Sequence, residues 1–130
     1  SVTRPAQCHA GPKVSGKPIA AGWGGYEDAL FEQHVVDVIE AHNTSKPLFL
    51  FWAPHIVHAP LQVPAVYLDR FSFMAGTDNS RRERQRYHAM VNFADAAVAN
   101  VTAAYRRKGM WDELLIFFSS DNGGPIYFNG

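Results

Sequence analysis

The chain has 130 residues, of which 47% are apolar, 13% aromatic and 18% charged, and this composition excludes an intrinsically disordered chain. The 12 basic residues balance the 12 acidic ones, which argues against a dedicated nucleic-acid binder and against a surface for anionic lipid. The longest apolar stretch, residues 48–54, is too short for a transmembrane segment, which needs about 20 residues.

The first part of the chain, residues 1–25, is rich in glycine and proline and keeps neither a helical nor a strand period. We predict an irregular segment there. From residue 26 onward the pattern predicts a helix that ends before residue 43, with acidic residues in its first turn. The side chains on the predicted buried face are Phe31, Val35, Val38, Ile39 and His42.

Residues 48–53 form a continuous apolar run between two prolines. Continuous apolarity predicts a strand buried on both faces, as in a parallel sheet. The prolines that follow predict a stiff loop over residues 54–64. A short helix is predicted over residues 66–71 and a polar loop over 74–80.

Residues 81–108 carry the clearest helical pattern, and Gly109 is well placed to end that helix. Residues 114–118 then repeat the apolar strand pattern, and a polar turn follows. The order helix, strand, loop, helix, strand predicts an α/β fold with mostly parallel strands and flanking helices. The apolar stripe of the long helix consists of Tyr87, Val91, Ala94, Val98, Val101 and Tyr105.

Ligands of α/β sheets bind beyond the carboxyl ends of the strands, where this sequence has two polar clusters. Asp121 and Asn122 offer the oxygen ligands that Ca²⁺ and Mg²⁺ prefer, although Asp-Asn-Gly is also an ordinary turn. His58 could transfer a proton, since the usual histidine pKa is about 6.5, or could be held structurally by a carbonyl. His55 and His58 together lack a third zinc ligand of matching spacing.

Three further residues are candidates for chemistry. Cys8 is the only cysteine, so the chain has no internal disulfide, and no basic constellation marks this residue as a nucleophile. Asn43 and Asn100 each begin an Asn-x-Ser/Thr tripeptide and are candidate glycosylation sites. Such sites hint at a secreted protein.

The segments 46–53, 57–64, 87–101 and 111–124 together resemble the sulfatase family, in particular its arylsulfatase B-like branch, in order and spacing. The match covers about residues 26–125. It implies an alkaline-phosphatase-like α/β fold, hydrolysis of sulfate esters and one bound Ca²⁺. Asp121 and Asn122 correspond to calcium ligands of the family. His58 corresponds to the histidine that contacts the sulfate group and assists the leaving alcohol.

The chain also departs from the family pattern. Sulfatases make a formylglycine nucleophile from cysteine in a C-x-P/A-x-R motif, whereas the sequence from Cys8 to Pro12 lacks the arginine and lies out of order. The family's paired aspartates, the lysine and histidine of its G-K-W-H-type segment and a later lysine are missing. Residues 26–130 are therefore expected to be part of an N-terminal sulfatase catalytic domain, inactive alone, with the nucleophile and the remaining calcium ligands elsewhere.

Two alternatives to a sulfatase stay open. The same superfamily includes phosphodiester and phosphonate hydrolases, which the nucleophile outside this segment would distinguish. The chain could also be a non-catalytic binding or pseudoenzyme fragment, which the missing cysteine motif favours. For a sulfatase, the expected substrate is a carbohydrate or aryl sulfate ester, and the expected location of the parent protein is secreted or lysosomal. The expected partner of this segment is the remainder of the sulfatase chain.

Overall fold

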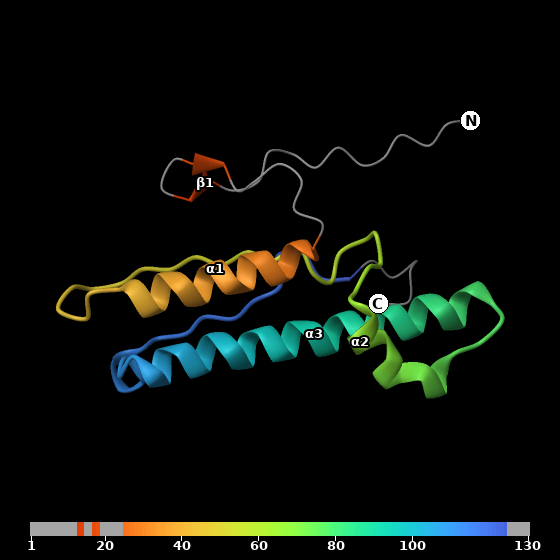
Figure 1. Ribbon diagram of the computed structural model, residues 1–130. Coiled ribbons are helices and arrows are strands. Elements are labelled where there is room, and N and C mark those ends of the chain that lie inside the picture. Colours follow the sequence, from red (N-terminus) through yellow and green to blue (C-terminus); the bar gives the residue numbers. More distant parts are fainter. Residues whose placement is uncertain (1–12, 15–16, 19–24, 125–130) are drawn as a thin grey trace.

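The computed structural model describes residues 13–14, 17–18 and 25–124 (Figure 1). Two helices dominate it, and the segments that follow each helix run back along them. In chain order the elements are β1 (Lys13–Val14), β2 (Lys17–Pro18), α1 (Glu27–Ala41), α2 (Ala65–Leu68), the 3₁₀ segment η1 (Asp69–Met74), α3 (Asn79–Arg107) and the 3₁₀ segment η2 (Trp111–Glu113).

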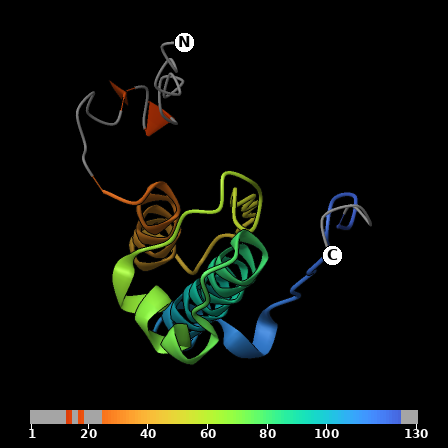
Figure 2. The same cartoon turned by 90° about the vertical axis from the view of Figure 1, so that its right-hand side faces the viewer.

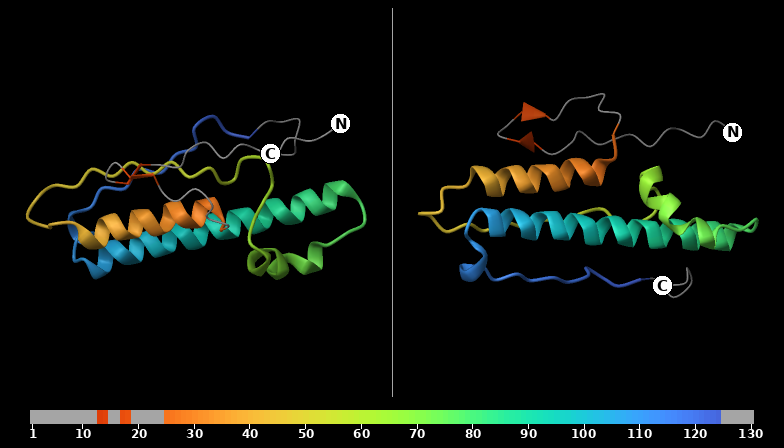
Figure 3. Two further views of the ribbon diagram at one scale, coloured as in Figure 1. Left: turned by 45° about the horizontal axis from the view of Figure 1, so that its top comes forward. Right: turned by 60° about the horizontal axis from the view of Figure 1, so that its bottom comes forward.

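Helices α1 and α3 lie side by side and run in the same direction (Figures 1 and 3). Polar contacts along the seam agree with this direction. The Asn100 side-chain nitrogen donates to Glu32 at 2.6 Å. About two turns further along both helices, the Arg107 guanidinium donates to Glu40 at 2.8 and 3.0 Å. The apolar core between the two helices consists of Val35, Ile39, Val101, Ala104 and Tyr105.

The ends of both helices follow from their sequences, and both helix predictions are confirmed. Helix α1 ends at Ala41, before the Asn-Thr-Ser-Lys-Pro run. Asp78 caps the start of α3, because its carboxylate accepts from the Arg81 backbone N–H at 2.8 Å. At the other end Gly109 has φ 71°, and the N–H of Met110 donates to Tyr105 O. This is the Schellman arrangement, which favours glycine at that position.

The buried face of α3 differs from the predicted stripe in the first half of the helix. Tyr87 and Val91 are 40% and 45% exposed, whereas Phe93 is 4% exposed. The Phe93 ring meets Tyr26 and Tyr67 edge-on, at centroid distances of 4.9 and 5.1 Å. Packing against these two rings turns the buried face of α3 toward Phe93, which helical periodicity alone did not predict.

The predicted mostly parallel sheet is wrong. Segments 48–53 and 114–118 run in the same direction on one side of the helix pair (Figures 1 and 2). No backbone hydrogen bond joins them, and within the described residues the paired strands are the two-residue β1 and β2, which are antiparallel. A strand needs a hydrogen-bonded neighbour, and here neither segment has one.

The prediction of burial on both faces is also wrong for these segments. Leu48, Leu50 and Trp52 pack against the helix core, whereas Phe49 and Phe51 between them are exposed, which is the alternation of a half-buried strand. In the second segment only Leu114 packs against the core, and residues 115–118 are all exposed. The most exposed of the outward side chains are Phe49 (91%), Phe51 (82%), Leu115 (89%), Phe117 (90%) and Phe118 (84%).

We call these exposed side chains the open apolar face. Large exposed apolar patches and unpaired strand-like backbone both favour association with another chain. Within the part of the chain that the structure describes, no helix is long and apolar enough to cross a membrane.

We expect the isolated chain to self-associate through the open apolar face. In size-exclusion chromatography with light scattering, the triple variant Phe49→Ser/Phe51→Ser/Phe117→Ser should elute as a monomer where the wild-type chain does not. Its helix content by circular dichroism should be unchanged, because these side chains contact solvent. The control Leu50→Ser lies on the packed side and should lose helix content instead. A monodisperse wild-type monomer with one sharp thermal transition would contradict this prediction.

Candidate functional site

The candidate site centres on the loop 54–60, which we call the histidine loop. It follows the extended segment 48–53, and prolines at 54 and 60 restrict its backbone. The peptide bonds Ile56–Val57 and Ala59–Pro60 are cis. A backbone hydrogen bond of 2.9 Å from the His58 N–H to His55 O closes a turn inside the loop.

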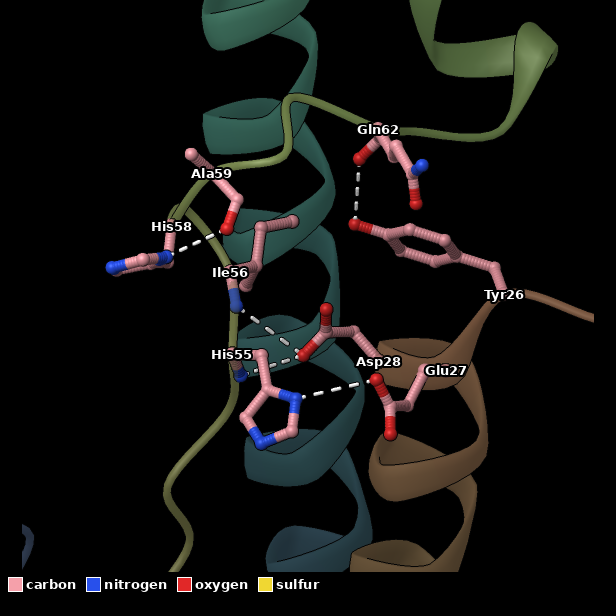
Figure 4. A network of polar contacts seen from close by, with 8 residues as sticks. All are labelled: Tyr26, Glu27, Asp28, His55, Ile56, His58, Ala59 and Gln62. Atoms are coloured by element: carbon pink, nitrogen blue, oxygen red, sulfur yellow. Dashed lines mark hydrogen bonds and ion pairs between the residues drawn. The ribbon is translucent and has the colours of Figure 1, made fainter. Parts of the chain in front are cut away.

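Helix α1 holds this loop through a buried carboxylate (Figure 4). Asp28, in the first turn of α1, is 7% exposed. Its Oδ1 atom accepts from the backbone N–H groups of His55 and Ile56 at 2.9 and 3.3 Å. Beyond the loop, the Tyr26 hydroxyl donates to Gln62 O at 3.0 Å. The start of α1 therefore forms hydrogen bonds to the backbone within the histidine loop and just after it.

The Tyr26 hydroxyl is the ionisable group most altered by this packing. Burial raises the pKa of Tyr26 to about 12 from its ordinary 10.0, and the negative charge of Asp28 adds to the rise. Both effects disfavour the phenolate. Tyr26 consequently keeps its proton, and its donor bond to Gln62, over a wider range of pH than a free tyrosine.

The two histidines of the loop are held differently. His58 is exposed, and its Nδ1 lies 2.7 Å from Ala59 O. Because a carbonyl only accepts, Nδ1 carries the proton, and Nε2 is left free on the outward side of the ring (Figure 4). His55 instead directs Nδ1 to Glu27 at 3.3 Å, and its ring meets Phe31 edge-on. In both histidines Nδ1 is engaged, and Nε2 has no partner among the described residues. They differ in what holds the ring, which is a backbone carbonyl of the loop for His58 and the Glu27 carboxylate of α1 for His55.

The second cluster is the turn 119–124, which is fully exposed. Gly123 adopts φ 72°, and its N–H donates to Ser120 Oγ at 3.0 Å. The Asn122 side-chain nitrogen donates to Asp121 Oδ1 at 2.8 Å and to Gly123 O at 3.1 Å. These hydrogen bonds are those of an ordinary Asp-Asn-Gly turn, one of the two interpretations that the sequence left open.

The residues of this turn fit a hard cation in kind but not in number. A carboxylate, an amide and a carbonyl are the oxygen types that calcium binds, yet calcium takes about six or more ligands. No group of three or more His, Cys, Asp or Glu side chains gathers in the described segments. The histidine pair likewise gains no third zinc ligand there.

The two clusters lie toward the same end of the molecule, because segments 48–53 and 114–118 both end there (Figures 1 and 3). No hydrogen bond or ion pair joins the described residues of one cluster to those of the other. The two clusters therefore lie toward the same end of the molecule, but the described residues show no polar contact between them.

The remaining candidates lie apart from this site. Asn43 is in the exposed turn after α1, where its Oδ1 accepts from Ser45 N–H and Oγ at 3.0 and 2.9 Å. Asn100 lies on α3 and is exposed, but its amide nitrogen donates to Glu32. Cys8 lies outside the described residues.

Asp28 was not among the residues that the sequence singled out. An acidic residue in a first helical turn is typical of any helix, and the sequence contains no signal that this carboxylate faces a loop 27 residues later.

The family model described as Sulfatase matches this chain over residues 2–130. The chain belongs to the sulfatase family. It is 38% identical over 101 residues to arylsulfatase J of Mus musculus, covering 78% of this chain and 16% of that protein. It is 30% identical over 98 residues to N-acetylgalactosamine-6-sulfatase of Mus musculus, covering 75% and 17%.

A bacterial relative gives a similar picture. The uncharacterized sulfatase YdeN of Escherichia coli (strain K12) is 28% identical over 111 residues, covering 82% of this chain and 19% of that protein. The chain spans less than one fifth of the length of these curated relatives. The sulfatase resemblance drawn from the sequence is confirmed.

The raised pKa of Tyr26 predicts a loss of stability in alkali. The folded chain holds this proton up to about pH 12, whereas the unfolded chain releases it near pH 10.0, so the free energy of unfolding falls between these values. The free energy of unfolding should fall less in Tyr26→Phe. Part of the fall should remain, because burial also raises the pKa of Tyr105. Urea unfolding at a series of pH values, in the soluble triple variant described above, measures it. An equal fall with and without Tyr26 would contradict this assignment.

Proposed function

We propose that this chain forms part of the catalytic domain of a calcium-dependent sulfuric ester hydrolase. Residues 54–60 and 119–124 would supply one side of its active site. The observation that carries the proposal is the free, outward Nε2 of His58 in a chain of the sulfatase family. The substrate would be a sulfate ester of a carbohydrate or an aryl alcohol, and the remaining active-site groups would come from the rest of the sulfatase chain.

In this proposal His58 acts as the acid that assists the leaving alcohol. The bond from Nδ1 to Ala59 O fixes the ring orientation and points Nε2 outward. To act as the acid, His58 must be the imidazolium, with a proton on each ring nitrogen. As the nucleophile from outside this segment bonds to sulfur and the bond between sulfur and the ester oxygen breaks, Nε2–H donates its proton to that oxygen. A neutral alcohol departs, and His58 is left neutral with its proton on Nδ1. Such proton transfer typically contributes about 10²–10⁴-fold to the rate.

Asp121 and Asn122 would hold the calcium ion. The support is the oxygen chemistry of these two side chains, in a chain of the sulfatase family. Bound calcium supplies positive charge that stabilises the negative oxygens of a sulfate group. The other ligands would be outside residues 119–124.

The formylglycine nucleophile of the family does not fit the residues of this chain. The sequence after Cys8 lacks the arginine of the family motif, so we assign no catalytic step to Cys8. Chemistry at the sulfur atom would need a nucleophile from outside this segment. A threonine nucleophile, rather than a cysteine or serine, would instead favour the phosphodiester or phosphonate hydrolase alternative.

We also propose N-glycosylation at Asn43 and Asn100, and a secreted or lysosomal location for the parent protein. Asn43 is in an exposed turn and Asn100 on the exposed side of α3. At Asn100 the oligosaccharide would replace the hydrogen bond to Glu32. Both sites lie away from the histidine loop.

The 130-residue chain alone should not hydrolyse aryl sulfates, because it lacks the nucleophile motif. Incubation with a chromogenic aryl sulfate and calcium should give no turnover above a blank that contains the metal. Turnover that disappears in Cys8→Ser would show that Cys8 is a nucleophile after all.

Variants of the complete sulfatase that contains this segment, cloned from its transcript, test the assigned roles. Asp121→Ala should weaken calcium binding and slow turnover, because it removes a charged ligand, and Asn122→Ala should weaken binding less. His58→Ala should leave calcium binding intact but slow turnover by about 10²–10⁴-fold. Calcium titration calorimetry and a series of aryl sulfates measure these effects.

The leaving-group series separates an acid from a binding residue. The loss in His58→Ala should shrink as the leaving alcohol becomes more acidic, because such an alcohol departs without a proton. His55→Ala is the matched control, since His55 is on the same loop but turned to Glu27. Loss of calcium binding in His58→Ala, or unchanged calcium binding in Asp121→Ala, would refute the roles.

A further inference from the structure

We propose that Asp28 is a positioning residue for His58: its buried carboxylate holds the histidine loop in the geometry that presents Nε2 to the substrate. This inference rests on the proposed function, because it concerns the same loop. Asp28 does not touch the ligand-facing nitrogen, and it acts through the backbone that leads to it.

The contacts of Asp28 carry the inference. One oxygen, Oδ1, accepts from two successive backbone N–H groups, those of His55 and Ile56 (Figure 4). The His58 N–H then donates to His55 O, so the same residue that Asp28 anchors also closes the turn under His58. A chain of hydrogen bonds therefore runs from α1 to the backbone of His58.

Burial makes this anchor costly to lose. Asp28 is 7% exposed and is the buried charged residue of the described chain. A buried carboxylate persists only where donors and favourable dipoles surround it, here two N–H groups and the positive end of α1. Without the carboxylate, the two N–H groups of the loop would lose their acceptor in a partly buried place.

The alternative is that Asp28 only stabilises the first turn of α1. Acidic residues at this position often interact with the free N–H groups of their own helix. Here the hydrogen bonds of the Asp28 carboxylate go to the loop, whereas Glu27, its neighbour, reaches the ring of His55 and is exposed. Glu27 shares the helix turn and the charge of Asp28 but not the backbone contacts, so it is a matched control.

Hydrogen exchange in the complete sulfatase tests the anchoring itself. In Asp28→Leu the amides of His55 and Ile56 should exchange about tenfold faster or more, whereas those of helix α3 should keep their protection. Asp28→Asn retains an Oδ1 acceptor and should restore most of the protection. Glu27→Gln should leave both amides unchanged. Equal protection in Asp28→Leu and wild type would overturn the proposal.

Turnover of an aryl sulfate with a poor leaving group tests the link to His58. Asp28→Leu should lower kcat by about 10–100-fold, with a smaller change in KM, and the loss should shrink for acidic leaving alcohols, as for His58→Ala. Asp28→Asn should recover most of the rate. In a His58→Ala background, Asp28→Leu should cost little more, because the side chain that it positions is gone.

A double variant in which both losses multiply would overturn the proposal, since Asp28 would then act on the fold as a whole. A His58→Ala variant with full turnover would refute the proposed function instead. The exchange result distinguishes the two failures, because it measures the loop without reference to catalysis.

Discussion

The parallel packing of α1 against α3 is the constraint on which the rest of this structure depends. Ile39 and Ala104 are fully buried at the seam, and the Glu40–Arg107 pair closes one end of it. Both helices run in one direction, and the segment after each returns along the pair in the opposite direction (Figure 1). This places the histidine loop and the 119–124 turn toward one end, although they lie about 60 residues apart in the chain.

The hydrogen bonds of Asp28 determine the backbone position of the histidine loop more closely than helix packing does. Helix packing alone positions residues 48–53, whose alternate side chains rest on the core, but it does not determine the backbone beyond Pro54. The carboxylate of Asp28 and the hydroxyl of Tyr26 fix that backbone at His55, Ile56 and Gln62. The site therefore depends on the first turn of α1 as much as on the loop that carries His58.

The sequence predicted the helices well because their signals are local. Acidic residues at the start of α1, the Asp78 cap and the Gly109 end each act within a few residues. It failed on the sheet, because an apolar run such as 114–118 shows that a segment avoids water but not which segment will pair with it. In the structure these segments remain without a pairing strand, and their phenylalanines are exposed.

The candidate site shows the same division. The residue types made His58, Asp121 and Asn122 candidates beside an ordinary turn and a structural histidine, and only the family resemblance gave them roles, which stay predictions. Asp28 was missed because its contact joins residues 27 positions apart. A crystal structure of the complete sulfatase grown with calcium and an unreactive sulfate ester tests the active-site assignment most directly. We predict a calcium ion on Asp121 and Asn122, with His58 Nε2 within hydrogen-bond distance of the ester oxygen. A calcium ion bound elsewhere, with His58 turned away from the ester, would contradict it.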